Sequence, residues 1–250
     1  MSCFKKLEKY LVYQPKVDLN TLEIVGLEAL IRFKDKETLK ILSTDKVINS
    51  IESVEEMIDL SKYVFSNVIS DMKKLEKLNY ETNISINLSS KEICNINLFN
   101  WLIELSEQNN KYVNMIEIEI TEKHEVKNIK LMRERIFLLR DVGFKISLDD
   151  LGVGFNQIDM IQKYEIDLIK VDKSMVRDFK NRNKDLKYIS YVSKKRNIKL
   201  LIEGIECNRD LRRFLNLGFE FGQGYYFYEP MELSKMLKNK NLLNSIRSIN

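Results

Sequence analysis

Acidic and amide side chains stand at the ends of otherwise hydrophobic segments along this chain. The segments and their polar residues are IVGLEAL with Glu28, ISINLS with Asn87, IEIEITE with Glu117, Glu119 and Glu122, FKISLDD with Asp149 and Asp150, IDLIKVD with Lys170, and IKLLIEG with Glu203. Any one of these carboxylates, taken alone, reads most simply as a solvent-facing residue of an edge strand. Several carboxylates in one buried site would repel one another, and a divalent cation between them removes that cost. The set therefore predicts a cation site where the strands end.

The donor types indicate which cation and which chemistry. Carboxylate and amide oxygens suit hard ions such as Mg²⁺ or Mn²⁺. The chain has one histidine, His124, which excludes two-histidine metal motifs. Asp149 and Asp150 are consecutive, so both reach one site only if the strand ends there and the chain turns, which Gly152 and Gly154 permit. Two ions about 3.5 to 4 Å apart are the usual arrangement for cutting phosphodiesters.

Two basic residues are placed to act beside the carboxylates. Lys170 near the end of a hydrophobic strand can orient or help deprotonate a metal-bound water, or stabilise charge on a phosphoryl oxygen. Read alone, it is equally a surface lysine with a buried stem. Arg32 follows Glu28 by four residues on the same face of its strand and can bind a phosphate oxygen, although an isolated arginine is more often a surface residue.

Short hydrophobic segments alternate with longer segments of helical period, which is typical of β/α units around a parallel sheet. The predicted strands are 11–17, 24–33, 83–87, 115–121, 144–149, 166–171, 198–203 and 219–222. Only DLNTLE separates the first two, so the first strand is expected to run antiparallel. Eight strands with helices between them favour a (β/α)8 barrel, and an open doubly wound sheet has the same local signals. In both folds the site lies at the carboxyl ends of the strands.

Composition and charge indicate a single globular domain. No linker or low-complexity tract divides the 250 residues, so we predict one domain over 1–250, with a core of about 10–232 and a C-terminal helical tail over 232–250. The net charge of +4 does not indicate a nucleic-acid partner, and no DNA or RNA binding is expected. No segment reads as a signal peptide or a spanning helix, and the three cysteines fit a reducing compartment. We therefore expect a cytoplasmic protein without membrane association.

In this order, the residues resemble the EAL-domain family of cyclic-di-GMP phosphodiesterases. The resemblance runs from YQPKVDL at Tyr13 to GQGYYFYEP at Pro230, through EALIRF, NLS, EITE, DDLGVG, IDLIKVD, EGIE and QGYYF. It implies an α/β fold, a TIM-like (β/α)8 barrel with the first strand antiparallel. It also implies hydrolysis of cyclic di-GMP to linear pGpG with two Mg²⁺ or Mn²⁺ ions per active site, and a homodimer.

The resemblance further implies a role for each matching residue. The implied metal ligands are Glu28, Asn87, Glu119, Asp149, Asp150 and Glu203. Lys170 would hold the attacking water with Glu203 beside it as the base, and Glu28 belongs with them in the catalytic set. The implied substrate contacts are Gln14, Leu30, Arg32 and Gln223, while Glu122 and Glu206 would support the site from beside the ligands.

The loop after the paired aspartates departs from the family pattern. DDLGVGFNQ stands where family members read approximately DDFGTGYSS, so Val153 and Phe155 lack the hydroxyls of threonine and tyrosine. This departure supports a second hypothesis, a catalytically weak or inactive cyclic-di-GMP receptor that signals through a partner. The intact set of acids, asparagine and lysine favours the phosphodiesterase. Metal-dependent chemistry on another phosphate ester is a third reading.

Overall fold

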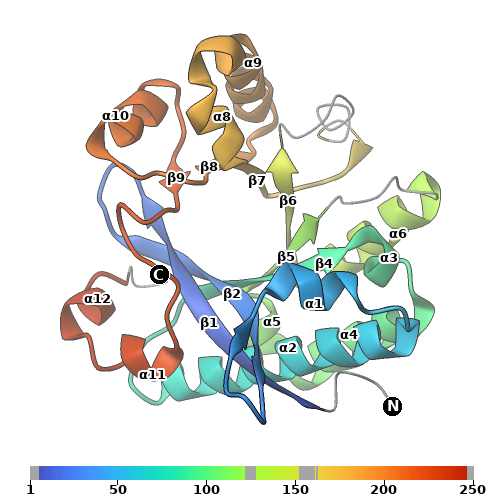
Figure 1. Ribbon diagram of the computed structural model, residues 1–250. Helices are drawn as coiled ribbons and strands as arrows, with labels where there is room; N and C mark the ends of the chain where they lie inside the picture. Colours follow the sequence, from blue (N-terminus) through green and yellow to red (C-terminus); the bar gives the residue numbers. More distant parts are fainter. Residues whose placement is uncertain (1–5, 122–127, 152–160, 162, 247–250) are drawn as a thin grey trace.

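Eight strands form a closed barrel at the centre of the computed structural model, which describes residues 6–121, 128–151, 161 and 163–246 (Figure 1). The barrel strands are β1 (Leu7–Asp18), β2 (Ile24–Asp35), β4 (Asn83–Ser89), β5 (Ile116–Thr121), β6 (Lys145–Leu151), β7 (Leu168–Val171), β8 (Lys199–Ile202) and β9 (Phe221–Gly222). β1 runs antiparallel to both of its neighbours, β2 and β9, and the remaining barrel pairs are parallel. Because β1 joins β2 to β9, the sheet closes. The predicted TIM-like barrel is confirmed, and the open doubly wound sheet is wrong.

The antiparallel strand follows from a tight hairpin. Oδ1 of Asp18 accepts hydrogen bonds from the backbone N–H groups of Asn20 and Thr21, at 2.8 and 3.1 Å, and this turn reverses the chain within DLNTLE. β1 and β2 then pair from Val17 with Ile24 to Leu7 with Asp35. The two strands are longer than the sequence indicated because their outer halves pair with each other.

A small second core lies beside the outer half of this hairpin. β3 (Ile41–Leu42) pairs with the end of β2, and α1 (Thr44–Asn49) follows it. Leu7, Phe33, Val47 and Leu60 are buried together there. These elements fill the segment after Arg32, in which the sequence analysis predicted no strand or helix.

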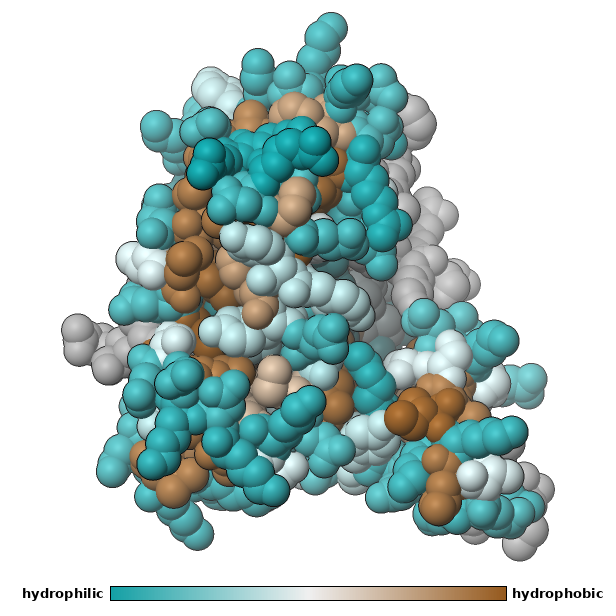
Figure 2. Space-filling view, turned by 60° about the vertical axis from the view of Figure 1, so that its left-hand side comes forward, coloured by the Kyte–Doolittle hydropathy of each residue, from teal (hydrophilic) through white to brown (hydrophobic). Residues whose placement is uncertain are grey.

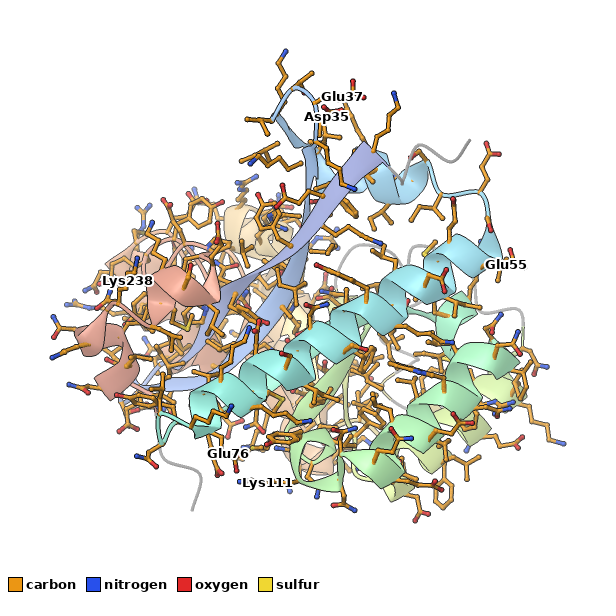
Figure 3. All side chains as sticks on the ribbon, turned by 90° about the horizontal axis from the view of Figure 1, so that it is seen from below. Asp35, Glu37, Glu55, Glu76, Lys111 and Lys238 are labelled. Atoms are coloured by element: carbon orange, nitrogen blue, oxygen red, sulfur yellow. The ribbon has the colours of Figure 1, made fainter. Side chains whose placement is uncertain are left out.

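Helices surround the barrel and cover its outer surface (Figure 1). They are α2 (Val54–Glu76), α3 (Ser90–Ile93), α4 (Ile96–Gln108), α5 (Asn110–Val113), α6 (Ile129–Asp141), α8 (Lys173–Arg177), α9 (Phe179–Arg196), α10 (Asn208–Asn216), α11 (Leu233–Met236) and α12 (Lys240–Asn244). The longest, α2, begins where Ser53 accepts a hydrogen bond from the N–H of Glu56, and it runs along the molecule from near Glu55 to Glu76 (Figure 3). Its apolar stripe, which includes Phe65 and Val68, is buried in the core.

Side-chain alternation along the strands separates a hydrophobic layer from a polar barrel interior. In β5, Ile116, Ile118 and Ile120 are fully buried in the main core, whereas Glu117 and Glu119 face the opposite way. The interior of a TIM barrel is usually packed with branched aliphatic side chains. Here charged and polar groups occupy it, so their partners decide whether the barrel is stable.

Hydrophilic residues cover most of the face seen in Figure 2, with hydrophobic residues in patches between them. None of the helices in the described ranges is long and apolar enough to span a membrane. At the C-terminal end, Leu233, Met236, Leu242 and Leu243 of α11 and α12 are buried in the main core. The division into a core of about 10–232 and a tail over 232–250 stays a prediction.

Candidate metal and catalytic site

Lys170 of β7 lies at the centre of the predicted site. Its Nζ is 2.8 Å from Oε2 of Glu119, 2.8 Å from Oε1 of Glu203, 3.1 Å from Oδ1 of Asp149 and 3.4 Å from Oε1 of Glu28. The lysine side chain is 1% exposed, which excludes the surface reading. Three of these carboxylates lie on β2, β5 and β6 and the fourth directly follows β8, so the barrel brings four carboxylates together around one ammonium.

Two amide side chains hold Glu28 from the other side. Nδ2 of Asn87 donates a hydrogen bond to Oε1 of Glu28 at 3.0 Å, and Nε2 of Gln223 donates to Oε2 at 2.7 Å. The same Nε2 of Gln223 also donates to Oε1 of Gln14 at 2.9 Å, and Nε2 of Gln14 donates to the carbonyl of Tyr228 at 3.1 Å. Both carboxylate oxygens of Glu28 are thus fixed, and Gln14 and Gln223 belong to the same connected cluster.

A second buried lysine, Lys16 of β1, lies deeper in the barrel. Its Nζ is 2.6 Å from Oε1 of Glu117 and 2.7 Å from Oε1 of Glu119, and Oγ of Ser147 donates to Oε1 of Glu117 at 3.2 Å. The sequence analysis did not select Lys16. The available signal was its spacing of two from Gln14, which places both side chains on one face of β1.

Burial and neighbouring charge shift the pKa values of Glu203 and Lys170. Burial raises the pKa of Glu203 to about 7; Glu28 and Asp149 add to the rise, and Lys170 opposes it. Burial lowers the pKa of Lys170, but the surrounding carboxylates, led by Asp149, outweigh it and raise this pKa well above its usual value. Lys170 therefore remains an ammonium at neutral pH and can orient or stabilise but not deprotonate. Glu203 exchanges a proton near neutrality.

The pKa of Glu119 moves in the opposite direction from that of Glu203. Burial raises it, but the charges of Lys16 and Lys170 together outweigh burial and hold the pKa of Glu119 well below its usual range. At Glu28, burial outweighs the charge of Lys170 and raises the pKa of the carboxyl. Glu119, which has no exposed surface, is therefore ionised at neutral pH.

The donor set fits a hard divalent ion. Oδ1 of Asn87 and Oε1 of Gln223 are buried and accept no hydrogen bond from any described residue. A buried amide oxygen without a donor is costly, and a cation is one partner that removes the cost. Within the described ranges, no three Asp, Glu, His or Cys side chains already stand at metal-ligand spacing. The described carboxylates of the cluster surround Nζ of Lys170.

The remaining predicted residues lie further from this cluster or outside the described part of the chain. Leu30 and Arg32 are half-buried on β2, where Nη1 of Arg32 donates to the carbonyl of Ile31 at 2.9 Å. Glu206 is exposed, and its Oε1 lies 3.7 Å from Nη2 of Arg177. Glu122 lies outside the described residues, as does the loop after Leu151. Asp150 lies in β6, but its side chain is not among those described.

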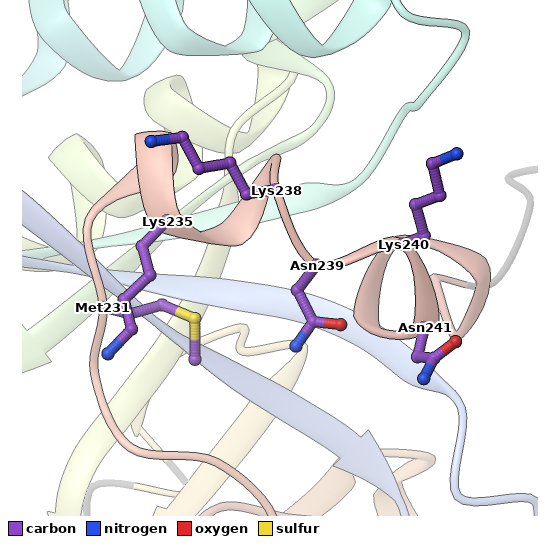
Figure 4. Close-up of a pocket in the computed structure, with 6 residues that line it drawn as sticks. All are labelled: Met231, Lys235, Lys238, Asn239, Lys240 and Asn241. Carbon is purple, nitrogen blue, oxygen red and sulfur yellow. The ribbon is translucent and has the colours of Figure 1, made fainter.

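A surface pocket elsewhere contains none of these residues. It has a volume of about 490 Å³ and is lined by Met231, Lys235, Lys238, Asn239, Lys240 and Asn241 at the C-terminal helices (Figure 4). The candidate site is therefore recognised by its converging charges and not by this cavity.

Comparison with known proteins identifies the family. Residues 4–230 match the model of the EAL domain. This chain belongs to the EAL-domain family of cyclic di-GMP phosphodiesterases. The cyclic di-GMP phosphodiesterase PdeR of Escherichia coli is 26% identical to this EAL domain over 222 residues, covering 88% of this chain and 33% of PdeR. The chain spans about a third of the length of the curated relatives it matches first, 36% of one Mycobacterium tuberculosis protein.

Solved structures share the fold of this EAL domain. The EAL enzyme Bd1971, solved with cAMP and cyclic di-GMP bound, matches with a TM-score of 0.84 and 27% identity, over 94% of this chain and 65% of that chain. The YkuI protein of Bacillus subtilis, solved with cyclic di-GMP and calcium, matches with a TM-score of 0.75 and 23% identity, over 92% of this chain and 57% of that one. At that lower identity the likeness concerns the fold alone.

Proposed function

We propose that this EAL domain is a cyclic-guanylate-specific phosphodiesterase that hydrolyses cyclic di-GMP to linear pGpG and so lowers the level of the second messenger. The observation that carries the proposal is the convergence of Glu28, Glu119, Asp149 and Glu203 on one buried lysine, with an acceptor oxygen of Asn87 left for a cation. The relatives PdeR and Bd1971 connect this family to cyclic di-GMP.

The cofactors of the proposal are two ions of Mg²⁺ or Mn²⁺. Glu28, Asn87, Glu119 and Asp149 would hold the first, and Asp149, Asp150 and, through a water molecule, Glu203 the second. Ions held in this way lower the pKa of water and stabilise charge on the leaving oxygen. The same carboxylates that repel one another in the buried cluster thereby become useful ligands.

Side chains of the protein would supply the remaining catalytic and binding roles. Lys170, an ammonium at neutral pH, would hold the attacking water or a phosphoryl oxygen by its fixed N–H donors. Glu203, 2.8 Å from Lys170 and with a pKa of about 7, would accept the proton from that water. Gln14, Leu30, Arg32 and Gln223 would contact the substrate, and Glu122 and Glu206 would support the site. A homodimer is part of the same proposal by analogy with the family.

The test is a time course of purified protein with cyclic di-GMP and Mg²⁺ or Mn²⁺, with pGpG separated by chromatography. Metal-dependent pGpG formation is expected, and Glu28→Ala is expected to abolish it because Glu28 joins Asn87 to Gln223. Glu107→Ala, which removes an exposed carboxylate on α4, is the matched control and should retain the wild-type rate.

The receptor hypothesis remains the second candidate because of the DDLGVGFNQ loop. Binding of cyclic di-GMP with no pGpG over hours would establish the receptor and overturn the enzyme. Absence of both binding and turnover would reject both readings and leave chemistry on another phosphate ester.

A further inference from the structure

The two oxygens of Glu119 are held by two different lysines. Oε1 lies 2.7 Å from Nζ of Lys16, and Oε2 lies 2.8 Å from Nζ of Lys170. Lys170 also contacts Glu28, Asp149 and Glu203, so Oε2 faces the carboxylate cluster. Lys16 contacts Glu117, two residues earlier in β5, so Oε1 faces the interior of the barrel.

We propose that Lys16 is a positioning residue for the metal site: it holds Oε1 of Glu119 and thereby turns Oε2 toward the ion. The inference rests on the proposed function, because it concerns a ligand of that site. Partners that lie behind a metal-ligating carboxylate or imidazole fix its orientation, and their removal typically weakens metal binding about 10- to 100-fold.

The barrel interior is built to accommodate this lysine. The lysine is 5% exposed, and Glu117 balances its charge at 2.6 Å. Ser147 donates to the same oxygen of Glu117. A buried ammonium persists only with such partners, so Lys16 and Glu117 form one unit with Glu119.

A competing effect of the same lysine has the opposite sign. A positive charge close to the site repels a divalent cation, so a lysine that acts by charge alone would weaken metal binding. Removal of Lys16 would then tighten binding. If Lys16 acts by orienting Glu119, its removal weakens binding, and the effect depends on the presence of the Glu119 carboxylate.

The experiment measures Mn²⁺ affinity by calorimetric titration of the full chain, with folding checked by circular dichroism and thermal unfolding. The double variant Lys16→Met with Glu117→Gln removes the pair without leaving an unpaired buried carboxylate. Glu117→Gln alone is the matched control, because it retains the contact between Lys16 and Glu119. We expect the double variant to bind Mn²⁺ about 10- to 100-fold more weakly than the Glu117→Gln protein.

A second background isolates the role of Glu119. In a Glu119→Gln protein, adding Lys16→Met and Glu117→Gln should leave the Mn²⁺ affinity unchanged, since the carboxylate that Lys16 orients is gone. The double variant Lys16→Gln with Glu117→Gln also has a neutral residue at position 16, but a polar one. It replaces the methionine variant if that variant does not fold, and the expected loss of Mn²⁺ affinity is the same. Unchanged or tighter Mn²⁺ binding in the folded double variant overturns the inference alone. A wild-type protein that binds neither Mn²⁺ nor Mg²⁺ overturns the proposed function.

Discussion

Replacement of Lys170 by methionine tests whether this one lysine holds the carboxylate cluster together. The substitution keeps a long, largely apolar side chain and removes the ammonium that lies within 3.4 Å of four carboxylates. Removal of one partner from a buried ion pair costs about 3 to 5 kcal/mol, because the remaining charge stays buried without compensation. At about 2 to 4 °C per kcal/mol for a chain of this size, the melting temperature should fall by roughly 6 to 20 °C.

Lys111→Met is the matched control for this experiment. Nζ of Lys111 lies 2.7 Å from Glu81 and also pairs with Glu76, but its side chain is 53% exposed (Figure 3). Water and salt screen such a pair, so this variant should unfold close to the wild-type temperature. The two lysines both contact glutamates, and burial is the difference that the comparison measures.

The assay is thermal and urea unfolding of both variants in a chelating buffer at pH 8 and at pH 5. The stability deficit of Lys170→Met should shrink at pH 5, because protonation of the carboxylates relieves their repulsion. In a buffer without chelator, free Mn²⁺ at 100 times its dissociation constant should stabilise a folded protein that binds it by about 2.7 kcal/mol. Equal melting temperatures for the Lys170 and Lys111 variants would refute the reasoning that burial makes Lys170 structurally necessary.

Two further predictions concern Glu203 and Gly224. The pKa of Glu203 is raised from 4.5 to about 7 in the folded protein, so the folded state binds more protons than the unfolded state between these pH values and the free energy of unfolding should fall as pH rises through them. Urea unfolding at pH 5 and pH 8 measures this difference in the free energy of unfolding, and Glu203→Gln should reduce it. A difference equal to that of the wild type would contradict the raised pKa. Gly224→Ala places a Cβ 2.2 Å from the carbonyl oxygen of Ile205, a backbone atom that cannot easily move. We expect a loss of about 1 to 3 kcal/mol of stability and weaker Mn²⁺ binding as the adjacent Gln223 shifts from Glu28; wild-type stability and affinity would show that the loop adjusts freely.

The amino-acid sequence by itself determined the elements and the donor types. The hydrophobic period located all eight barrel strands, and the short DLNTLE connection required the first pair to be antiparallel. The strand boundaries were less accurate: β1 begins at Leu7, four residues earlier than predicted, because its outer half pairs with β2, far from the two residues that pair with β9. The set of acidic residues at strand ends indicated a cation site because several carboxylates in one buried site repel one another unless a cation lies between them.

Only the tertiary structure decided which of these groups meet. Periodicity is local, so it could not distinguish a closed barrel from an open sheet; closure depends on pairing between β1 and β9, some 200 residues apart. Arg32 and Glu28 share a strand face in the sequence, but the described contacts of Arg32 lie with the backbone of Ile31. In the sequence, nothing distinguishes Lys16 from other charged residues. In the folded barrel it contacts Glu117 and Glu119, which are about 100 positions away. The sequence specifies the type of each side chain, whereas strand register across the barrel determines which side chains it contacts. Those contacts determine its charge state, its orientation and its chemistry.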